Sequence, residues 1–540
     1  MPAAEAETVI VGGGTAGCVL ASLLADGASD LIVVLEAGPD YGPFALGRWP
    51  ADLLDPRSFG WTHEWGYDSG DTYPDRVIPF YRARVLGGCS AHNSCQAVWG
   101  HRADYDAWAA RGNNGWSARD LEPLFVEAST RMAVSPVGEA EMSPFSKSFL
   151  DAAGLRSYPL ADDLTSLDGG PGAARLPKNI VGGMRWNTAF AYLEGVRDRV
   201  RVIPDALVDR IDIASSRARG VRFTTPNGPQ ELSAGRVILA AGTYGSPAVL
   251  LRSGVGPPDE LQAIGIKPKV GLPGVGRNLH DHPQIELIYD GTPRLNAAMA
   301  DWIHDHPQGI SEQAVVKARS SCAGGVFDLH VWANGGMPLG SGWQGGPPFQ
   351  GDPRNWQWEI GVSCLTPQSR GSLRLRTASP DDSPIIDHRY LSDPDGHDEQ
   401  VLADGIAIAR SFAATPPCVW LGNELPPTVG ARSRKALGAT IRANCVHYWH
   451  PVGTCAMGPQ SDPASVVDAT GRVHGLANVY VADASIMPTA PRANTNIPAV
   501  VVAHRIAQSL GAAAATTQIA ASSPGPAPPQ PAHRQRPGHQ

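Results

Sequence analysis

Short apolar runs at the start of the chain predict a strand, a helix and a second strand. Residues 8–11 have the pattern of a buried strand, and residues 16–24 form an apolar helical segment after a glycine-rich turn. Residues 31–35 form a second apolar run that ends at Glu36. Continuous apolar runs of this length are typical of strands buried on both faces of a parallel sheet. The pattern therefore predicts a βαβ unit.

The same pattern returns in the middle and at the end of the chain. A strand-like run at 236–241 leads into a helical segment at 246–251, and a strand-like run at 479–482 precedes a helical segment at 497–510. We therefore expect one discontinuous α/β domain with a Rossmann-like nucleotide-binding fold. Its predicted segments are residues 1–155, 195–283 and 451–511.

The region between these segments has a different pattern. It is rich in Trp, Gly and Pro, with strand-like runs at 327–331, 356–362 and 372–376. These features predict an inserted α+β domain built on an antiparallel sheet, which would bind the substrate. We assign this domain to residues 156–194 and 284–450. Residues 512–540 are rich in Ala, Pro, Gln and Ser without periodicity, and we expect a disordered tail there.

Composition narrows the class of protein. Of 540 residues, 42% are hydrophobic and 18% are charged, which is ordinary for a globular protein. The net charge of −8 argues against nucleic acid as a partner. The eight cysteines show no Cys-x-x-Cys pair and no zinc spacing, so we expect reduced thiols and no metal. An acidic N-terminus that leads straight into a strand, and the absence of a membrane-length apolar run, predict a cytoplasmic protein without a membrane span.

A glycine motif connects the first strand to the first helix. Residues 12–17 (GGGTAG) match the pattern GxGxxG. In such a turn Gly12 allows the tight bend, Gly14 lets the backbone approach a pyrophosphate, and Gly17 lets helix and strand pack closely. Glu36 ends the second strand, where an acidic residue accepts hydrogen bonds from ribose hydroxyls. An acidic partner disfavours a 2′-phosphate, so the motif predicts FAD or NAD rather than NADP.

Further segments resemble the glucose–methanol–choline (GMC) oxidoreductase family. They are residues 84–93 (RVLGGCSAHN), 242–247 (GTYGSP), 253–257 (SGVGP), 274–283 (GVGRNLHDHP), 450–454 (HPVGT), 481–485 (VADAS) and 491–496 (PRANTN). All occur in the family's order between residue 8 and about residue 510. The resemblance implies an FAD-binding domain and favours FAD over NAD.

The resemblance also implies a set of cofactor-binding residues. They are Gly12, Gly14, Thr15, Ala16, Gly17, Glu36, Val85, His92, Asn93, Ser94, Val208, Asp483, Ala484 and Thr495. The run 87–95 (GGCSAHNSC) is similar to that of the choline-oxidising members, in which the histidine is bonded covalently to the flavin. This similarity implies a covalent link through His92. The alternative is a noncovalent flavin beside a hydrogen-bonded histidine.

Two residues are implied to act on the substrate. His450 would take the hydroxyl proton while hydride leaves for flavin N5, since imidazole titrates near neutral pH. Asn494 would hold the substrate oxygen against it. The alternatives are a core histidine beside Trp449 and a helix-capping asparagine. His447 lacks further ligands at metal spacing and is expected to be structural. Trp332 and Trp449 are expected to line the pocket.

These features predict an FAD-dependent enzyme that oxidises the CH–OH group of a small alcohol and passes electrons to dioxygen or another acceptor. Two alternatives stay open: a dehydrogenase linked to a carrier such as a quinone or the peptide-derived mycofactocin, and an FAD-containing hydroxynitrile lyase. Choline-oxidising members carry a glutamate facing the substrate ammonium after Asp-His-Pro, where this chain has Gln284. A neutral amide stabilises a cation less, which argues against choline. A homodimer is compatible with the sequence.

Overall fold

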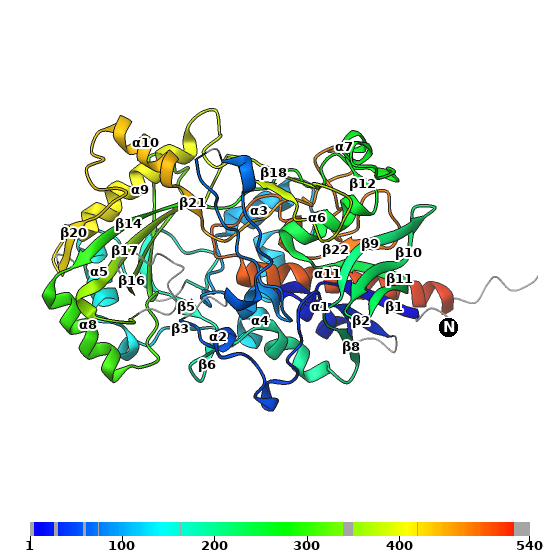
Figure 1. The fold of residues 1–540 in the computed structure, drawn as a ribbon, viewed down its shortest axis with the longest axis horizontal. Coiled ribbons are helices and arrows are strands. Elements are labelled where there is room, and N and C mark those ends of the chain that lie inside the picture. Colours follow the sequence, from blue (N-terminus) through cyan, green and yellow to red (C-terminus); the bar gives the residue numbers. More distant parts are fainter. Residues whose placement is uncertain are drawn as a thin grey trace, which may run out of the picture.

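Two seven-stranded sheets lie at opposite ends of the long axis of the molecule (Figure 1). The structure is a computed structural model that describes residues 5–25, 31–57, 61–73, 75–161, 164–338, 349–417 and 420–522. One sheet is largely parallel and the other is antiparallel. The predicted class, a nucleotide-binding α/β domain with an antiparallel-sheet domain, is confirmed.

The first sheet combines strands from distant parts of the chain. β1 (Glu5–Val11) is parallel to both of its neighbours, β2 (Ile32–Leu35) and β11 (Gly228–Leu239). β22 (Val479–Val481) pairs in parallel with the end of β11. β8 (Val200–Ile203) pairs with β2 at one edge, and at the other side β10 (Arg217–Thr225) pairs with β11 and is followed by the edge strand β9 (Leu207–Ala214). The predicted assembly of this sheet from the start, middle and end of the chain is confirmed.

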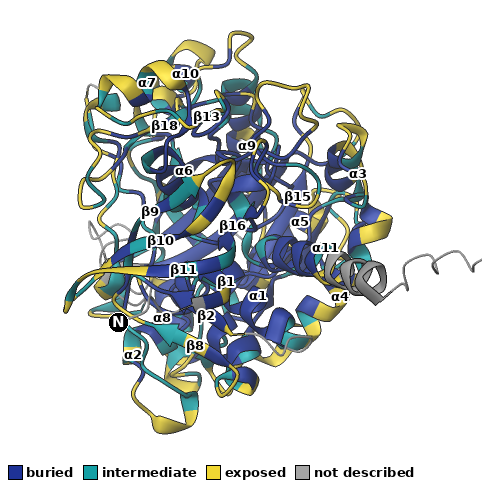
Figure 2. Cartoon of the chain, turned by 90° about the vertical axis from the view of Figure 1, so that its right-hand side faces the viewer, coloured by how far each residue is buried: buried dark blue, intermediate teal, exposed yellow. Residues whose placement is uncertain are grey.

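Helices are stacked in layers on one side of this sheet. α1 (Thr15–Ala25) is almost entirely buried, because it packs against both the sheet and α11 (Asn496–Ser522) (Figure 2). α4 (Ala118–Arg131) packs against α11 in turn. α11 continues past residue 511, where the sequence predicted a disordered tail, because its alanine-rich extension has high helix propensity. Residues 523–540 of that predicted tail lie outside the described residues.

The second sheet is antiparallel. Its strand order is β20 (Leu421–Glu424), β14 (Pro283–Gly291), β17 (Trp356–Cys364), β16 (Leu329–Pro338), β15 (Ala314–Ala318) and β4 (Gly172–Arg175). β21 (Val446–His447) also pairs with β14. One face is apolar and packs against α5 (Pro144–Leu155), α8 (Pro293–Asp305) and α9 (His397–Ala413), with α10 (Arg434–Asn444) lying on α9.

The opposite face of this sheet carries Trp332 and several buried polar side chains. In the strand register, Trp332 lies between Val315 on one neighbour and Gly361 on the other. A Cβ atom on Gly361 would lie 2.1 Å from the indole, so the glycine is needed to seat the ring flat on the sheet. His330 and Gln284 share this face because residues two apart on a strand point the same way.

Packing crosses two of the predicted boundaries. α5 belongs to the core of the antiparallel sheet, although the domain boundary was predicted at residue 155. The strand predicted at 372–376 is β18 (Ser372–Arg374), which pairs with β19 (Ile385–Asp387) outside the seven-stranded sheet. Leu373 is buried in the core of the nucleotide-binding domain. Its apolar side chain therefore packs in the core of the nucleotide-binding domain and not in the substrate-binding domain, to which it was assigned.

The remaining elements are short. They are α2 (Ala51–Leu54), α3 (Arg102–Ala110), α6 (Gly242–Arg252), α7 (Pro258–Ala263), β3 (Ser135–Pro136), β5 (Pro177–Lys178), β6 (Ile180–Val181), β7 (Met184–Arg185), β12 (Val255–Gly256) and β13 (Val270–Gly271). Across the described residues, no helix combines the length and the apolar character needed to cross a membrane.

Candidate active site

A cavity of about 380 Å³ is lined by residues from both sheets. Val11, Leu35 and Ala240 lie at the carboxyl ends of β1, β2 and β11, and Trp332 comes from the antiparallel sheet. Ligands of open α/β sheets bind at the carboxyl ends of the parallel strands. The cavity therefore has the position of a nucleotide site that opens onto the second domain.

Most of the sequence-predicted site residues line this cavity. They are Gly12, Gly14, Thr15, Ala16, Glu36, His92, Asn93, Ser94, Val208, His450, Asp483, Ala484, Asn494 and Thr495. Gly17 and Val85 do not line it. Gly17 lies against Gly12, whose carbonyl oxygen would be only 1.9 Å from an added Cβ, and Val85 is buried in the core beside the cavity-lining Arg84. Trp332 and Trp449 line the cavity as well.

The glycine turn leaves space for a ligand at one position. Gly12 has φ +98°, and a Cβ there would lie 2.6 Å from the carbonyl oxygen of Ala240. A Cβ on Gly14 would meet no protein atom closer than 3.7 Å. The space in front of Gly14 is therefore cavity, next to the N–H groups that open α1. Such N–H groups have no partner within the helix and attract phosphate. The turn fits the pyrophosphate of a dinucleotide.

Glu36 is fixed by the backbone. Its Oε2 accepts a hydrogen bond from Gly13 N at 2.8 Å, and its Oε1 accepts one from Gly38 N at 2.9 Å. Burial raises the pKa of Glu36 to about 7, although the two backbone N–H groups oppose the shift. Each oxygen keeps a further lone pair, so the carboxylate can still accept from ribose hydroxyls.

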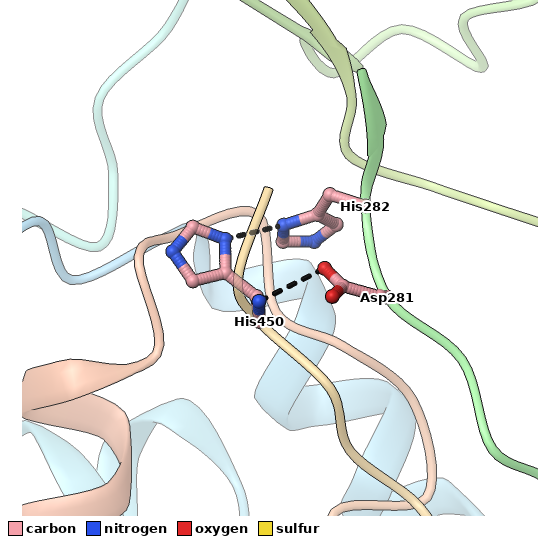
Figure 3. A group of neighbouring side chains, drawn as sticks. All are labelled: Asp281, His282 and His450. Carbon is pink, nitrogen blue, oxygen red and sulfur yellow. Dashed lines mark hydrogen bonds between the residues drawn. The ribbon is translucent and has the colours of Figure 1, made fainter. Parts of the chain in front are cut away.

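His450 has three partners around it, of which Figure 3 draws Asp281 and His282. Its Nδ1 lies 3.0 Å from Nδ1 of His282, and its backbone N–H donates to Oδ1 of Asp281 at 2.9 Å. On the far side of the ring, Nε2 lies 3.3 Å from Nδ2 of Asn494. Burial, followed by the charges of His282 and Arg82, lowers the pKa of His450 well below its usual value. The ring is therefore neutral near pH 7.

These contacts assign the tautomer of His450. Asn494 Nδ2 is a donor, so the nearby Nε2 of His450 carries the lone pair, and the hydrogen sits on Nδ1. Nδ1–H then donates to Nδ1 of His282. His282 in turn carries its hydrogen on Nε2. Burial lowers the pKa of His282 to about 3, although the Pro491 carbonyl opposes this shift, so this ring is neutral as well. The basic nitrogen of His450 is the one beside Asn494.

Asn494 also contributes an unused acceptor. Its Oδ1 is buried and has no hydrogen-bond partner among the described residues. Both Asn494 and His450 line the cavity. A hydroxyl placed there would accept from Asn494 Nδ2 and donate to His450 Nε2. Asp281, His282 and His450 also lie close enough to hold a metal ion. The two imidazoles, however, hydrogen-bond each other, and Asp281 Oδ1 accepts from the backbone N–H of His450.

Gln284 does not lie where the family resemblance implied. It is fully buried and is not among the residues that line the cavity. The Trp332 indole donates to Ser363 at 3.3 Å, and Ser363 donates to Oε1 of Gln284 at 3.1 Å. Gln284 is therefore linked to the cavity-lining Trp332 only through Ser363, and its neutral amide does not disfavour choline.

The loop that carries His92 holds a charged cluster that sequence reasoning missed. His92 Nδ1 lies 3.1 Å from Oε1 of Glu64. Burial lowers the pKa of His92, but Cys89 and Glu64 outweigh it, and the net shift is upward. Burial raises the pKa of Cys89, but Arg82 and His92 lower it to about 6. Glu64 and Arg82 belong to no motif, so only the fold reveals them.

His447 lies outside the cavity lining, as expected for a structural residue. Its Nε2 is 2.7 Å from the carbonyl oxygen of Pro79, and burial lowers its pKa to about 3. The ring is therefore neutral and donates to that carbonyl. His282 was quoted in a motif but given no role, although it supports His450 directly.

Comparison with known proteins agrees with this architecture. Two models of the GMC oxidoreductase family match residues 6–284 and 367–503. The chain is 30% identical to choline oxidase from Arthrobacter globiformis, over 95% of each chain. It is also 30% identical to an alcohol dehydrogenase (acceptor) from Pseudomonas putida, over 93% of this chain and 95% of the relative. The crystal structure of pyridoxine 4-oxidase from Mesorbium loti matches with a TM-score of 0.80 at 25% identity, over 93% and 98% of the two chains.

Fold and site thus define a dinucleotide-binding oxidoreductase with a histidine–asparagine pair at the cavity. The chain belongs to the GMC oxidoreductase family, whose members bind FAD.

Proposed function

We propose that the protein oxidises the CH–OH group of a small alcohol, with His450 as the base. The observation that carries this proposal is the buried lone pair of His450 Nε2, which lies 3.3 Å from Asn494 Nδ2 on the cavity wall. The FAD that the family binds supplies the hydride acceptor when it is present. The residues of the chain provide the proton chemistry and the orientation of the alcohol.

The geometry supports a division of labour between the two residues. Asn494 would donate to the substrate oxygen, which fixes the alcohol and stabilises negative charge as it develops. His450 Nε2 would accept the hydroxyl proton and become an imidazolium. His282 would accept a hydrogen bond from Nδ1–H throughout, so that the ring cannot turn its lone pair away from the cavity. Removal of water by burial strengthens each of these interactions.

For the cofactor we propose a covalent link to His92, which lines the cavity on the loop after Gly88. Oε1 of Glu64 lies 3.1 Å from its Nδ1, so Nε2 is the nitrogen that we propose for the bond. Acid precipitation tests this point: the pellet should stay yellow in the wild-type protein and lose its colour in His92→Ala. A colourless wild-type pellet would show a noncovalent flavin beside His92.

Two kinds of electron acceptor are compatible with the family. The relatives include an oxidase and an acceptor-linked dehydrogenase, so membership of the family allows both. Dioxygen is the acceptor we propose first, and a quinone or a peptide-derived carrier is the alternative.

The decisive experiment mixes the FAD-loaded protein anaerobically with primary, aryl and amino alcohols. The proposal predicts that the flavin absorbance bleaches with at least one alcohol, and that His450→Ala keeps its flavin but bleaches far more slowly. Peroxide on re-aeration would identify an oxidase. Bleaching that reverses only with an added carrier would identify a dehydrogenase. A flavin that is never reduced, together with release of cyanide from a cyanohydrin, would contradict the proposal and indicate a lyase.

A further inference from the structure

A second polar group faces the cavity besides the pair at His450. Glu312 lines the cavity just before β15 and is 8% exposed. Its Oε2 accepts a hydrogen bond from Gln96 Nε2 at 2.7 Å, and Lys178 Nζ lies 3.7 Å from the same oxygen. Lys178 also donates to the Ser94 carbonyl at 2.8 Å. All partners of the carboxylate therefore lie on one oxygen.

The other oxygen of Glu312 is available to a ligand. No described residue donates a hydrogen bond to Oε1, and this oxygen is not among the fully buried atoms without a partner. A cavity-lining carboxylate oxygen in this state accepts hydrogen bonds and donates none. It would bind a substrate group that carries a hydrogen and would reject one that can only accept.

The charge of Glu312 is already balanced. Lys178 is 4% exposed, and burial lowers its pKa while Glu312 opposes that shift. A substrate cation would add positive charge beside Lys178, whereas a neutral hydroxyl would gain a charge-assisted hydrogen bond without disturbing the ion pair. A neutral donor suits the site better than an ammonium group.

Aromatic rings connect Glu312 to the base. Tyr448 lines the same cavity as Glu312. The ring of Tyr448 lies 4.5 Å from that of His450 and stacks parallel to Trp332 at 6.0 Å. A small molecule over these rings would have one end at His450 and the other toward Glu312.

We propose that Glu312 determines specificity by accepting a hydrogen bond from a second hydroxyl group of the alcohol substrate. The inference rests on the proposed oxidation at His450 and adds a substrate class: neutral diols or polyols with a hydroxyl distant from the reacting carbon.

Three probes of equal chain length test this inference: a terminal diol, its monomethyl ether and the matching monohydroxy alcohol. The wild-type holoenzyme should prefer the diol to its ether by about tenfold or more in kcat/KM, because the ether can only accept. In Glu312→Gln, the amide oxygen must face Gln96 and Lys178, so the amide NH₂ faces the cavity. The diol-to-ether ratio should then fall to near one, chiefly because the ether improves.

A matched control is Glu424→Gln, which removes a carboxylate paired with Arg410 in the same domain but away from the cavity lining. It should keep the wild-type ratio. Should Glu312→Gln lose flavin or fail to fold with Lys178 uncompensated, the double variant Lys178→Met/Glu312→Gln removes both charges and should show the same loss of preference.

The outcomes separate the two proposals. Oxidation of the monohydroxy alcohol without preference for the diol, or a preference that survives in both Glu312 variants, would overturn the role of Glu312 alone. Turnover of choline above that of the diol, lost in Glu312→Gln, would overturn the neutral substrate class. Failure of every alcohol to reduce the flavin would overturn the oxidation itself and this inference with it.

Discussion

The Nδ1 atoms of His282 and His450 lie 3.0 Å apart, and both rings are buried. Two imidazole nitrogens at this distance must share one hydrogen, so each ring fixes the tautomer of the other. Asn494 on the opposite side assigns that hydrogen to His450. A residue that never faces the substrate can therefore decide which nitrogen of the base is free.

Replacing His282 should impair the base without removing it. In His282→Ala, His450 Nδ1–H loses its acceptor and the ring can adopt the wrong tautomer, so kcat/KM should fall by roughly 10²-fold. In His282→Gln, the amide oxygen can accept the same hydrogen bond and should restore most of the activity. The measurement is the pH profile of kcat/KM at equal flavin content. His447→Gln is the control and should keep the wild-type profile; equal activity of both His282 variants would contradict the positioning role.

The pH dependence should reflect the environment of His450. Burial and neighbouring positive groups lower its pKa, and only the neutral ring accepts a proton. The acid limb of kcat/KM should therefore lie below pH 6.5, the ordinary imidazole value, and activity should stay level from there to neutral pH. His450→Gln should retain flavin, lose roughly 10³-fold in rate and lack this limb. An acid limb above pH 7 would show that His450 is not the base or is not buried in the working enzyme.

Local pattern was sufficient to predict the nucleotide fold. The apolar runs at 8–11 and 31–35 became β1 and β2, with Val9 paired to Val33, because a parallel buried sheet leaves no other place for such runs. Most of the motif residues from Gly12 to Asn494 line one cavity, which lies at the carboxyl ends of β1, β2 and β11. The first strands and the glycine turn could be predicted because they depend on the order of neighbouring residues and on the chemistry of short motifs.

Other features depend on register and packing, which the sequence does not display. Gln284 follows Asp-His-Pro, yet it does not line the cavity; it accepts from Ser363, which accepts in turn from the cavity-lining Trp332. Glu312 lies in no motif, and it lines the cavity only because β15 runs beside β16. The alanine-rich segment after residue 511 lacks periodicity, but its helix propensity carries α11 to Ser522.

Two glycines of the same turn should respond differently to alanine. At Gly17 a Cβ would lie 1.9 Å from the Gly12 carbonyl oxygen, so Gly17→Ala must push α1 from β1 and should destabilise the fold by about 3 kcal/mol or more. At Gly14 the Cβ would meet no protein atom closer than 3.7 Å, so Gly14→Ala should fold normally but bind FAD about tenfold more weakly. Apoprotein melting and FAD titration measure the two effects. A stable Gly17→Ala protein would contradict the close packing.

His504 offers a test of burial far from the cavity. Its Nε2 lies 2.8 Å from the Tyr192 hydroxyl, the ring is 1% exposed, and burial lowers its pKa to about 4. The unfolded chain would take up a proton near pH 6.5, whereas the folded protein resists until about pH 4. Stability is therefore complete above pH 6.5 and falls as the pH drops through this window.

This one group lowers the free energy of unfolding at pH 4 by about 3 kcal/mol relative to its value above pH 6.5. His504→Gln can keep the bond to Tyr192 but cannot titrate, so it should be equal to or slightly less stable than the wild type at pH 8 and become more stable between pH 6 and pH 4. Calorimetric melting of both proteins in matched buffers measures the pH at which the variant becomes the more stable protein. The other buried histidines titrate equally in both proteins, so their effect disappears from the stability difference. A stability difference that does not change with pH would show that His504 is accessible to protons in the folded protein.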